Sequence, residues 1–205
     1  MISKFLTAKH WQLFSLMVGV PFVTQFIMMG TMFLDVFLET SQNEADIFSF
    51  YKFFPLIILF YMGMLFGWFW AIAIGLQNMI PESVKMKTNK FKIFFFIPVI
   101  YIFCITLLLS GFLNGMFQNV TEPSFEILGA LGGIIFPLHI LSMFGVFYCL
   151  YFVAKTIKTI ELQKEVSFGE FAGEFFLLWF YYVGIWIIQP KINKMVENEN
   201  TTFYT

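Results

Sequence analysis

Five long apolar stretches follow one another along this chain of 205 residues, separated by short polar loops whose lysines fall almost entirely on alternate connections. Each stretch approaches or exceeds the roughly 20 residues that an α-helix needs to cross about 30 Å of hydrocarbon. The composition agrees, because 12% of the residues are charged, against roughly 25% in soluble domains. The pattern predicts an all-α polytopic bundle of five transmembrane helices in a lipid bilayer.

The five predicted spans cover about residues 11–34, 50–76, 91–117, 127–153 and 168–189. No long hydrophilic segment leaves room for a separate soluble domain, so residues 1–205 form a single membrane domain. Residues 154–165 mix isoleucine and leucine with lysine and glutamate at helical spacing, which predicts a cytoplasmic continuation of the fourth helix. We interpret this continuation as a solvated helix end, with a docking surface as the alternative.

The distribution of lysine predicts the orientation, since lysine-bearing loops stay on the cytoplasmic side of a membrane. Nine of the twelve lysines fall on the N-terminal segment, the second loop and the fourth loop. This places the N-terminus inside, and five crossings then place the C-terminus outside. Lys191 and Lys194 in the C-terminal tail oppose this orientation, and they would favour the opposite side if the fifth segment failed to span.

The fifth segment is the weakest span, because its uninterrupted apolar part, residues 175–188, covers only about 21 Å as a helix. Upstream, Ser167 and Glu170 have the spacing of a capping box, which predicts a helix start there. A helix from this cap to Pro190 has about 22 residues and is long enough to span.

Ionisable residues are rare in hydrocarbon and mark functional hypotheses. Only one histidine, His139, lies near the middle of a predicted span. Counting inward from the outer end of each span places Gln25, Tyr61, Thr106, and Tyr181 or Tyr182 at a similar depth. This candidate midplane cluster is either a hydrogen-bonded knot that fixes helix packing or the core of a proton or substrate path.

Prolines and glycines predict the shape of the bundle. Pro21, Pro98 and Pro137 indicate bends in the first, third and fourth spans, which are either static kinks or the walls of a midplane cavity. Small residues at four-residue spacing permit close helix packing, and they recur at Gly63 and Gly67, Gly111 and Gly115, and Gly129 and Gly133. The last two pairs predict a tight hairpin of the third and fourth helices, whereas Gly63 and Gly67 face either another helix or a second copy of the chain.

The sequence also argues against several functions. It contains no H-E-x-x-H, no G-x-S-x-G and no nucleotide-binding glycine loop, and we expect no enzymatic activity, metal or cofactor. A net charge of -1 favours no nucleic acid. The absence of arginine beside abundant lysine, asparagine, isoleucine and phenylalanine is typical of an AT-rich bacterial genome, so we expect the bacterial inner membrane as the location.

Several stretches of the chain resemble a family of small bacterial polytopic membrane proteins with no assigned activity. They are AKHWQLF (8–14), GWFWAIAIGLQNMIP (67–81), FKIFFFIPVIYI (91–102), PLHILSMFGVFYCLYFVAKTIKTIELQKEVSF (137–168) and EFFLLWFYYVGIWIIQPKIN (174–193). The resemblance implies an integral membrane protein and supplies no reaction. Relatives tend to carry a proline in the last helix where this chain has Tyr182.

Taken together, these features predict a non-enzymatic accessory or scaffold subunit that binds other membrane proteins, or itself, through its glycine faces and cytoplasmic continuation. The alternative is a small oligomeric transporter or channel with His139, Gln25 and Thr106 along a midplane path. An intramembrane enzyme is a third, more distant hypothesis.

Overall fold

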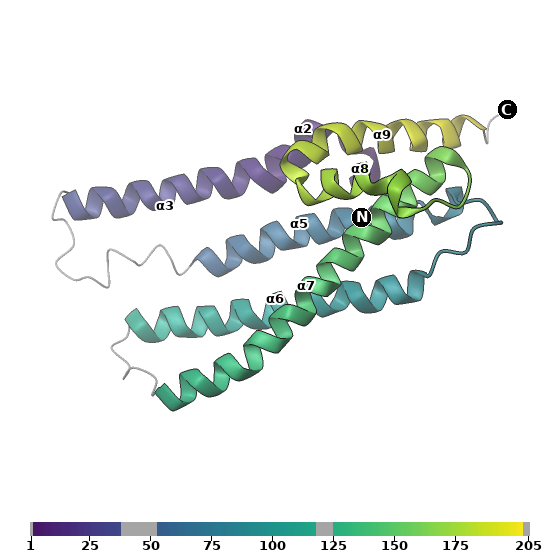
Figure 1. The fold of residues 1–205 in the computed structure, drawn as a ribbon. Helices are drawn as coiled ribbons and strands as arrows, with labels where there is room; N and C mark the ends of the chain where they lie inside the picture. Colours follow the sequence, from purple (N-terminus) through teal and green to yellow (C-terminus); the bar gives the residue numbers. More distant parts are fainter. Residues whose placement is uncertain (1, 38–52, 118–124, 203–205) are drawn as a thin grey trace.

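The computed structural model of the chain describes residues 2–37, 53–117 and 125–202, and this part consists of helices joined by short turns (Figure 1). The first residues of the predicted second span, 50–52, lie outside it. The elements are α1 (Ile2–Thr7), α2 (His10–Phe14), the π-helical turn η1 (Ser15–Gly19), α3 (Val20–Phe37), α5 (Phe54–Gly75), the 3-10 turn η3 (Gln77–Met79), α6 (Thr88–Phe117), α7 (Phe125–Leu162), α8 (Phe168–Trp179) and α9 (Tyr181–Thr202).

Within the described residues, four helical segments are long and apolar enough to cross a membrane: His10–Leu34, Phe54–Met79, Thr88–Gly111 and Gly132–Leu162. They coincide with the first four predicted spans. The all-helical membrane fold is therefore confirmed with four candidate spans, whereas a fifth span is not.

The predicted fifth span is two helices instead of one. The capping box is present, with the Glu170 carboxylate accepting hydrogen bonds from the Ser167 backbone N–H at 2.7 Å and hydroxyl at 3.0 Å. However, α8 ends at Trp179, and α9 begins at Tyr181 and continues beyond Pro190 to Thr202. The prediction of one helix that stops at Pro190 was wrong.

The break leaves α8 and α9 side by side as an antiparallel helical hairpin with its tip at Phe180 (Figure 1). The Phe180 carbonyl accepts hydrogen bonds from the N–H groups of Val183 and Gly184, at 3.0 and 2.9 Å, which starts α9. A Cβ atom added to Gly184 would overlap the backbone carbonyl of Leu177. Glycine is therefore what allows the first turn of α9 to lie against the last turn of α8.

The predicted continuation of the fourth helix is confirmed, since α7 runs unbroken to Leu162. Gln163, with a φ of 50°, ends it in the left-handed conformation that often terminates helices. Only the end of this continuation is solvated: residues 161–165 are exposed, whereas the side chains of Thr156, Ile157 and Thr159 are fully buried. The hairpin of α8 and α9 covers this part of α7.

Proline acts differently in the three helices for which bends were predicted. Just before Pro21, residues Ser15–Gly19 form a π-helical turn, a local change in the hydrogen-bond pattern at the expected place. Pro98 and Pro137 lie inside the continuous helices α6 and α7. Gly145 of α7 packs on α6 at this level, since an added Cβ would lie 2.8 Å from both the Phe94 carbonyl oxygen and Pro98 Cδ.

The packed core lies at one end of the bundle, which we call the lysine-rich end. The turn η3, the end of α7 and the last turns of α9 meet there, as the hydrogen bonds from Gln163 to the Met79 carbonyl and from Asn78 to Glu199 show. Fully buried side chains such as Trp68 and Phe171 fill this end. Toward the other end the helices separate (Figure 1), and side chains such as Phe26 and Phe136 are more than 60% exposed, as expected of a lipid-facing surface.

Candidate functional site

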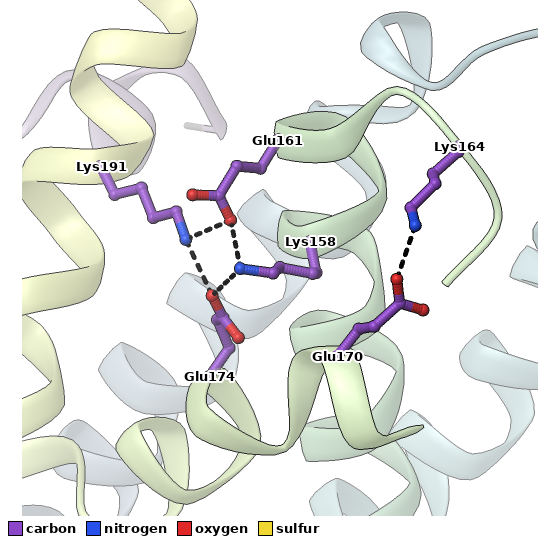
Figure 2. Close-up of polar contacts among 6 residues, drawn as sticks. All are labelled: Lys158, Glu161, Lys164, Glu170, Glu174 and Lys191. Atoms are coloured by element: carbon purple, nitrogen blue, oxygen red, sulfur yellow. Dashed lines mark hydrogen bonds and ion pairs between the residues drawn. The ribbon is translucent and has the colours of Figure 1, made fainter. Parts of the chain in front are cut away.

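Two lysines and two glutamates from three helices form a closed ring of ion pairs at the lysine-rich end (Figure 2). Lys158 Nζ lies 2.8 Å from Glu161 Oε2 on α7 and 3.4 Å from Glu174 Oε1 on α8. Lys191 of α9 contacts the same two oxygens, at 2.6 and 2.8 Å. The ring therefore connects α7 to both arms of the hairpin, and its four charges cancel.

Glu174 is the buried member of the ring, with a side chain only 10% exposed. Burial acts to raise the pKa of this carboxyl, but the hydrogen bond from Lys191 and the two neighbouring lysines outweigh it, so the pKa is lowered from its usual value. Because a buried carboxylate without a cation is costly, the ring stabilises the hairpin only while all four groups keep their charges.

Glu170, at the start of α8, forms a separate ion pair with Lys164 at 2.7 Å (Figure 2). The hydrogen bond from Lys164, with further hydrogen bonds from the backbone and hydroxyl of Ser167, lowers the pKa of Glu170 to about 2. This exposed pair anchors the loop before α8 and leaves the ring unaffected.

A second polar group lies deeper, around the amide of Gln189 on α9. Its Oε1 accepts a hydrogen bond from the buried Trp68 indole at 2.8 Å, and its Nε2 donates to the backbone carbonyls of Phe5 and Ala8, both at 2.9 Å. One turn later, Asn193 Nδ2 donates to the Leu6 carbonyl at 2.7 Å. These amides satisfy carbonyls that the end of the short helix α1 leaves without intrahelical partners.

The predicted midplane cluster is not assembled as one group among the described residues. The rings of Tyr61 and Tyr181 are neighbours, with centroids 5.9 Å apart. Thr106 is buried and donates to the Ile102 carbonyl of its own helix, and Gln25 is only partly buried on α3. His139 is exposed and contacts Tyr101 instead, and its part in any function stays a prediction.

His139 instead lies on the exposed outer face of α7, where its Nδ1 is 3.0 Å from the Tyr101 hydroxyl of α6. Beside this pair, α6 and α7 enclose a shallow groove of about 580 Å³ that includes Tyr101, Cys104, Leu138 and Leu141. Ionisable side chains in membrane helices almost always face the interior of a bundle. A histidine on the outer face is therefore the unusual feature of this surface.

The predicted glycine faces differ in whether another helix packs against them. Gly67 packs on α1, with the position of an added Cβ 2.9 Å from Phe5 Cζ, so it faces a helix of the same chain. Among the residues whose side chains are described, no atom lies within 4 Å of such a Cβ at Gly63, Gly111, Gly129 or Gly133. The tight hairpin through Gly111, Gly129 and Gly133 therefore stays a prediction, and Gly115 lies outside the residues whose surroundings are described.

Glycines that do permit close approach, Gly75, Gly145 and Gly184, were not predicted. Gly75 meets α1, since an added Cβ would lie 2.5 Å from Ile2 Cγ2. The ring and the Gln189 amide also lay outside the sequence prediction. Gln189 and Asn193 are amides four residues apart, so they share one helix face. This spacing is the sequence feature from which a polar contact on that face could have been predicted.

Within the described residues, no three histidine, cysteine, aspartate or glutamate side chains are grouped so that they could hold a metal ion. Comparison of the chain with protein-family models, curated proteins and solved structures found no match. The resemblance proposed from the sequence accordingly stays a prediction, and the geometry alone carries the functional argument.

Proposed function

We propose that the chain is a non-enzymatic subunit of a membrane protein complex and that it binds a transmembrane helix of its partner in the groove between α6 and α7. The observation that supports this proposal is the contact of the partly buried Tyr101 with the exposed His139, beside a groove that is apolar apart from Tyr101 and Lys92. Lipid chains offer no hydrogen bonds to the remaining polar atoms of this pair, whereas the side chains of a partner helix can supply them.

The position of the pair along its helices supports contact with a helix instead of with the membrane surface. Tyr101 lies nine residues beyond Lys92, or about 14 Å along α6, and His139 lies sixteen residues before Lys155, or about 24 Å along α7. Both distances fall inside a hydrocarbon layer of about 30 Å. A partner that covers this face must therefore do so within the membrane.

The transporter alternative has less support. A path would need polar side chains that share a water-accessible space, whereas His139 is exposed beside Tyr101 and Thr106 is buried with its hydroxyl bonded to the Ile102 carbonyl. A cavity between α1, α5 and α6, about 450 Å³, is lined by apolar side chains such as Phe66, Val99 and Phe103. Such a cavity suits an acyl chain or a hydrophobic side chain better than an ion.

We further propose that four helices cross the membrane and that α8 and α9 form a re-entrant hairpin, so that both termini are cytoplasmic, as in a bacterial inner membrane. Contacts of Lys191 with Glu161 support this arrangement, because they bring the C-terminal tail to the lysine-rich end. Eleven of the twelve lysines then lie on one side and only Lys52 on the other. Five crossings with an external C-terminus would separate the tail lysines from the rest.

Cross-linking in native membranes tests the proposed partner site. Cys104 lies exposed in the groove, whereas Cys149 is buried, so a maleimide photocross-linker should label Cys104 selectively. We expect adducts with another membrane protein from Cys104. The matched control carries Cys104→Ser with Val23→Cys on the exposed face of α3, and it should give lipid adducts alone.

A second variant tests the role of the polar pair. His139→Leu should lower the yield of the adduct about threefold, the effect of one interhelical hydrogen bond of roughly 0.6 kcal/mol. Because His139 is exposed, the variant should lower thermal stability by no more than the loss of its hydrogen bond to Tyr101. Equal adducts from Cys104 and Val23→Cys would contradict the proposal. An adduct of twice the mass of the chain would identify a second copy as the occupant.

A further inference from the structure

A pocket of about 350 Å³ opens at the lysine-rich end, between segment 80–87, the start of α6 and the last turns of α7. Four lysines and two tyrosines line it, together with the buried Phe152 and the exposed Glu165. We call it the basic pocket, and its lysines and tyrosines are Lys85, Lys87, Lys90, Tyr148, Tyr151 and Lys155.

The positive charge of the basic pocket is largely uncompensated. Lys155 pairs with Glu165 at a long 3.5 Å, and the Glu165 side chain is 76% exposed. Within the described residues, no ion pair involves Lys85, Lys87 or Lys90, whereas Lys158, Lys164 and Lys191 nearby are all paired. Four cations that converge on one cavity with a single loosely held carboxylate repel one another unless an anion lies between them.

The first turn of α6 adds to this potential. The helix begins at Thr88, between Lys87 and Lys90, and continues for 30 residues. Its first backbone N–H groups and the positive end of its dipole lie at the pocket with the lysines. Lysine ammonium groups bind phosphate as point charges, and the hydroxyls of Tyr148 and Tyr151 can donate hydrogen bonds to phosphate oxygens.

The floor of the basic pocket is aromatic, which favours a lipid over a soluble anion. The Tyr148 ring packs on Phe94 with centroids 4.6 Å apart, and Tyr151 stacks on Phe168 at 6.5 Å. Tyrosines at the end of apolar helices are typical of the membrane interface, the level of phospholipid headgroups. Basic pockets between transmembrane helices on the cytoplasmic side bind anionic headgroups.

We infer that the basic pocket binds the headgroup phosphate of an anionic phospholipid at the proposed cytoplasmic surface. This inference rests on the membrane location of the chain and not on the partner site between α6 and α7, so each can fail without the other. Lys85, Lys87, Lys90 and Lys155 neutralise the phosphate, and the two tyrosines orient it from the membrane side.

Native mass spectrometry of the full chain in detergent, with equimolar phosphatidylglycerol and phosphatidylcholine, tests the inference. Wild-type protein should retain phosphatidylglycerol in preference to phosphatidylcholine. The triple variant Lys85→Gln, Lys87→Gln, Lys90→Gln should lose this preference. The ratio of bound phosphatidylglycerol to bound phosphatidylcholine should fall by about fivefold for each lysine that contacts the headgroup. These three lysines are exposed, so the thermal unfolding midpoint should be unchanged.

The matched control is Lys4→Gln, Lys9→Gln, Lys194→Gln, which removes the same charge from exposed positions outside the pocket. This control should keep the wild-type preference. An equal loss in both triple variants, or no preference in the wild type, would overturn the inference. A separate titration with inorganic phosphate distinguishes the source, because phosphate binding without a preference for phosphatidylglycerol would assign the pocket to a soluble anion and overturn the lipid.

Discussion

At the scale of single residues, the Gln189 side chain connects three separate parts of the chain. Its amide joins the indole of Trp68 on α5 to the carbonyls of Phe5 and Ala8 on either side of the end of α1. All of these atoms are buried or partly buried, so their hydrogen bonds cannot be replaced by bulk water. Removing the amide takes this partner from the Trp68 indole N–H and the Phe5 carbonyl, whereas the Ala8 carbonyl keeps a hydrogen bond from Asn193 at 3.2 Å.

Gln189→Leu should therefore lower the free energy of unfolding by about 1–3 kcal/mol, the cost of unsatisfied buried polar groups. Thermal unfolding followed by circular dichroism in detergent measures this effect. Gln25→Leu on α3 is the matched control, because Gln25 is partly exposed and should change little. If both variants unfold at the same temperature, the amide of Gln189 is not what holds α1 to α9.

The sequence identifies which polar residues lie inside apolar segments, but it does not predict which side of the helix each of them faces. His139 could be singled out because an ionisable residue inside an apolar stretch is rare, but the face on which it lies depends on how α7 is rotated against α6. That rotation is set by the contact of Gly145 with Phe94 and Pro98, which no single-helix pattern contains. The sequence does not predict the buried hydrogen bonds of Gln189, because Pro190 predicts the end of the helix one residue later. In the structure, α9 continues through Pro190.

At the scale of elements, the α8–α9 hairpin depends on a close contact of backbones. Helix packing at Gly184 leaves no room for a side chain, since an added Cβ would overlap the Leu177 carbonyl. Elsewhere on α8, Gly173 has no atom within 4 Å of an added Cβ. Alanine substitutions at these two glycines therefore separate the effect of steric crowding from the general effect of replacing glycine by alanine in a helix.

Gly184→Ala should destabilise the protein by about 1–3 kcal/mol, the usual cost of overpacking, and should open the hairpin to proteolysis near Phe180. Gly173→Ala should be neutral or slightly stabilising, because alanine favours helix over glycine. Limited proteolysis and thermal unfolding of both variants measure the difference. An unchanged proteolytic pattern in Gly184→Ala would show that the hairpin tolerates the extra methyl group.

The ion-pair ring gives the hairpin a dependence on pH. Because the pKa of Glu174 is lowered in the folded protein, its carboxylate stabilises the fold at pH values above the usual glutamate pKa of about 4.3. That stabilisation is lost as the pH falls through the lowered value. The unfolding midpoint should therefore be nearly constant from pH 8 to 5 and fall below this range.

Glu174→Gln separates this contribution from general acid denaturation. The variant should lose about 2 kcal/mol at pH 7, because a charged hydrogen bond to Lys191 is lost, and its further loss between pH 5 and pH 3 should be smaller than that of the wild type. Thermal unfolding at each pH in a non-ionic detergent checks both effects. An acid transition of unchanged size in the variant would assign the pH dependence to other carboxylates.

The elements themselves divide into those that hydropathy predicts and those that it does not. The four candidate spans were predicted, because an apolar segment of 20 or more residues has few alternatives to a membrane helix. The break between α8 and α9 was not, because neither a proline nor a glycine stands at Phe180 to signal it. Its causes are tertiary: the fit of Gly184 on Leu177 and the ion pairs of Lys191.

At the scale of the whole molecule, the hairpin resolves a conflict that the sequence already contained. Lys191 and Lys194 were misplaced by a fifth crossing, and Lys191 instead lies 2.6 Å from Glu161 on α7. Both termini then belong to the lysine-rich end, where Asn193 of α9 donates a hydrogen bond to the Leu6 carbonyl of α1. With the four crossings that we propose, the lysine distribution and the position of the C-terminal tail no longer conflict.

A reporter fused after Thr205 distinguishes the two topologies. With four crossings and a re-entrant hairpin, a fluorescent protein at the C-terminus should fold in the cytoplasm, whereas alkaline phosphatase there should be inactive. The reverse result would restore the external C-terminus and require α8 and α9 to separate in the membrane.

The same pair of fusions carrying Lys191→Glu places a third acid beside Glu161 and Glu174 and should weaken the hairpin by like-charge repulsion. If that variant keeps a cytoplasmic C-terminus, the tip of the hairpin and Gln189 are sufficient to hold the topology. If its C-terminus moves outside, the ring of charges is what prevents a fifth crossing.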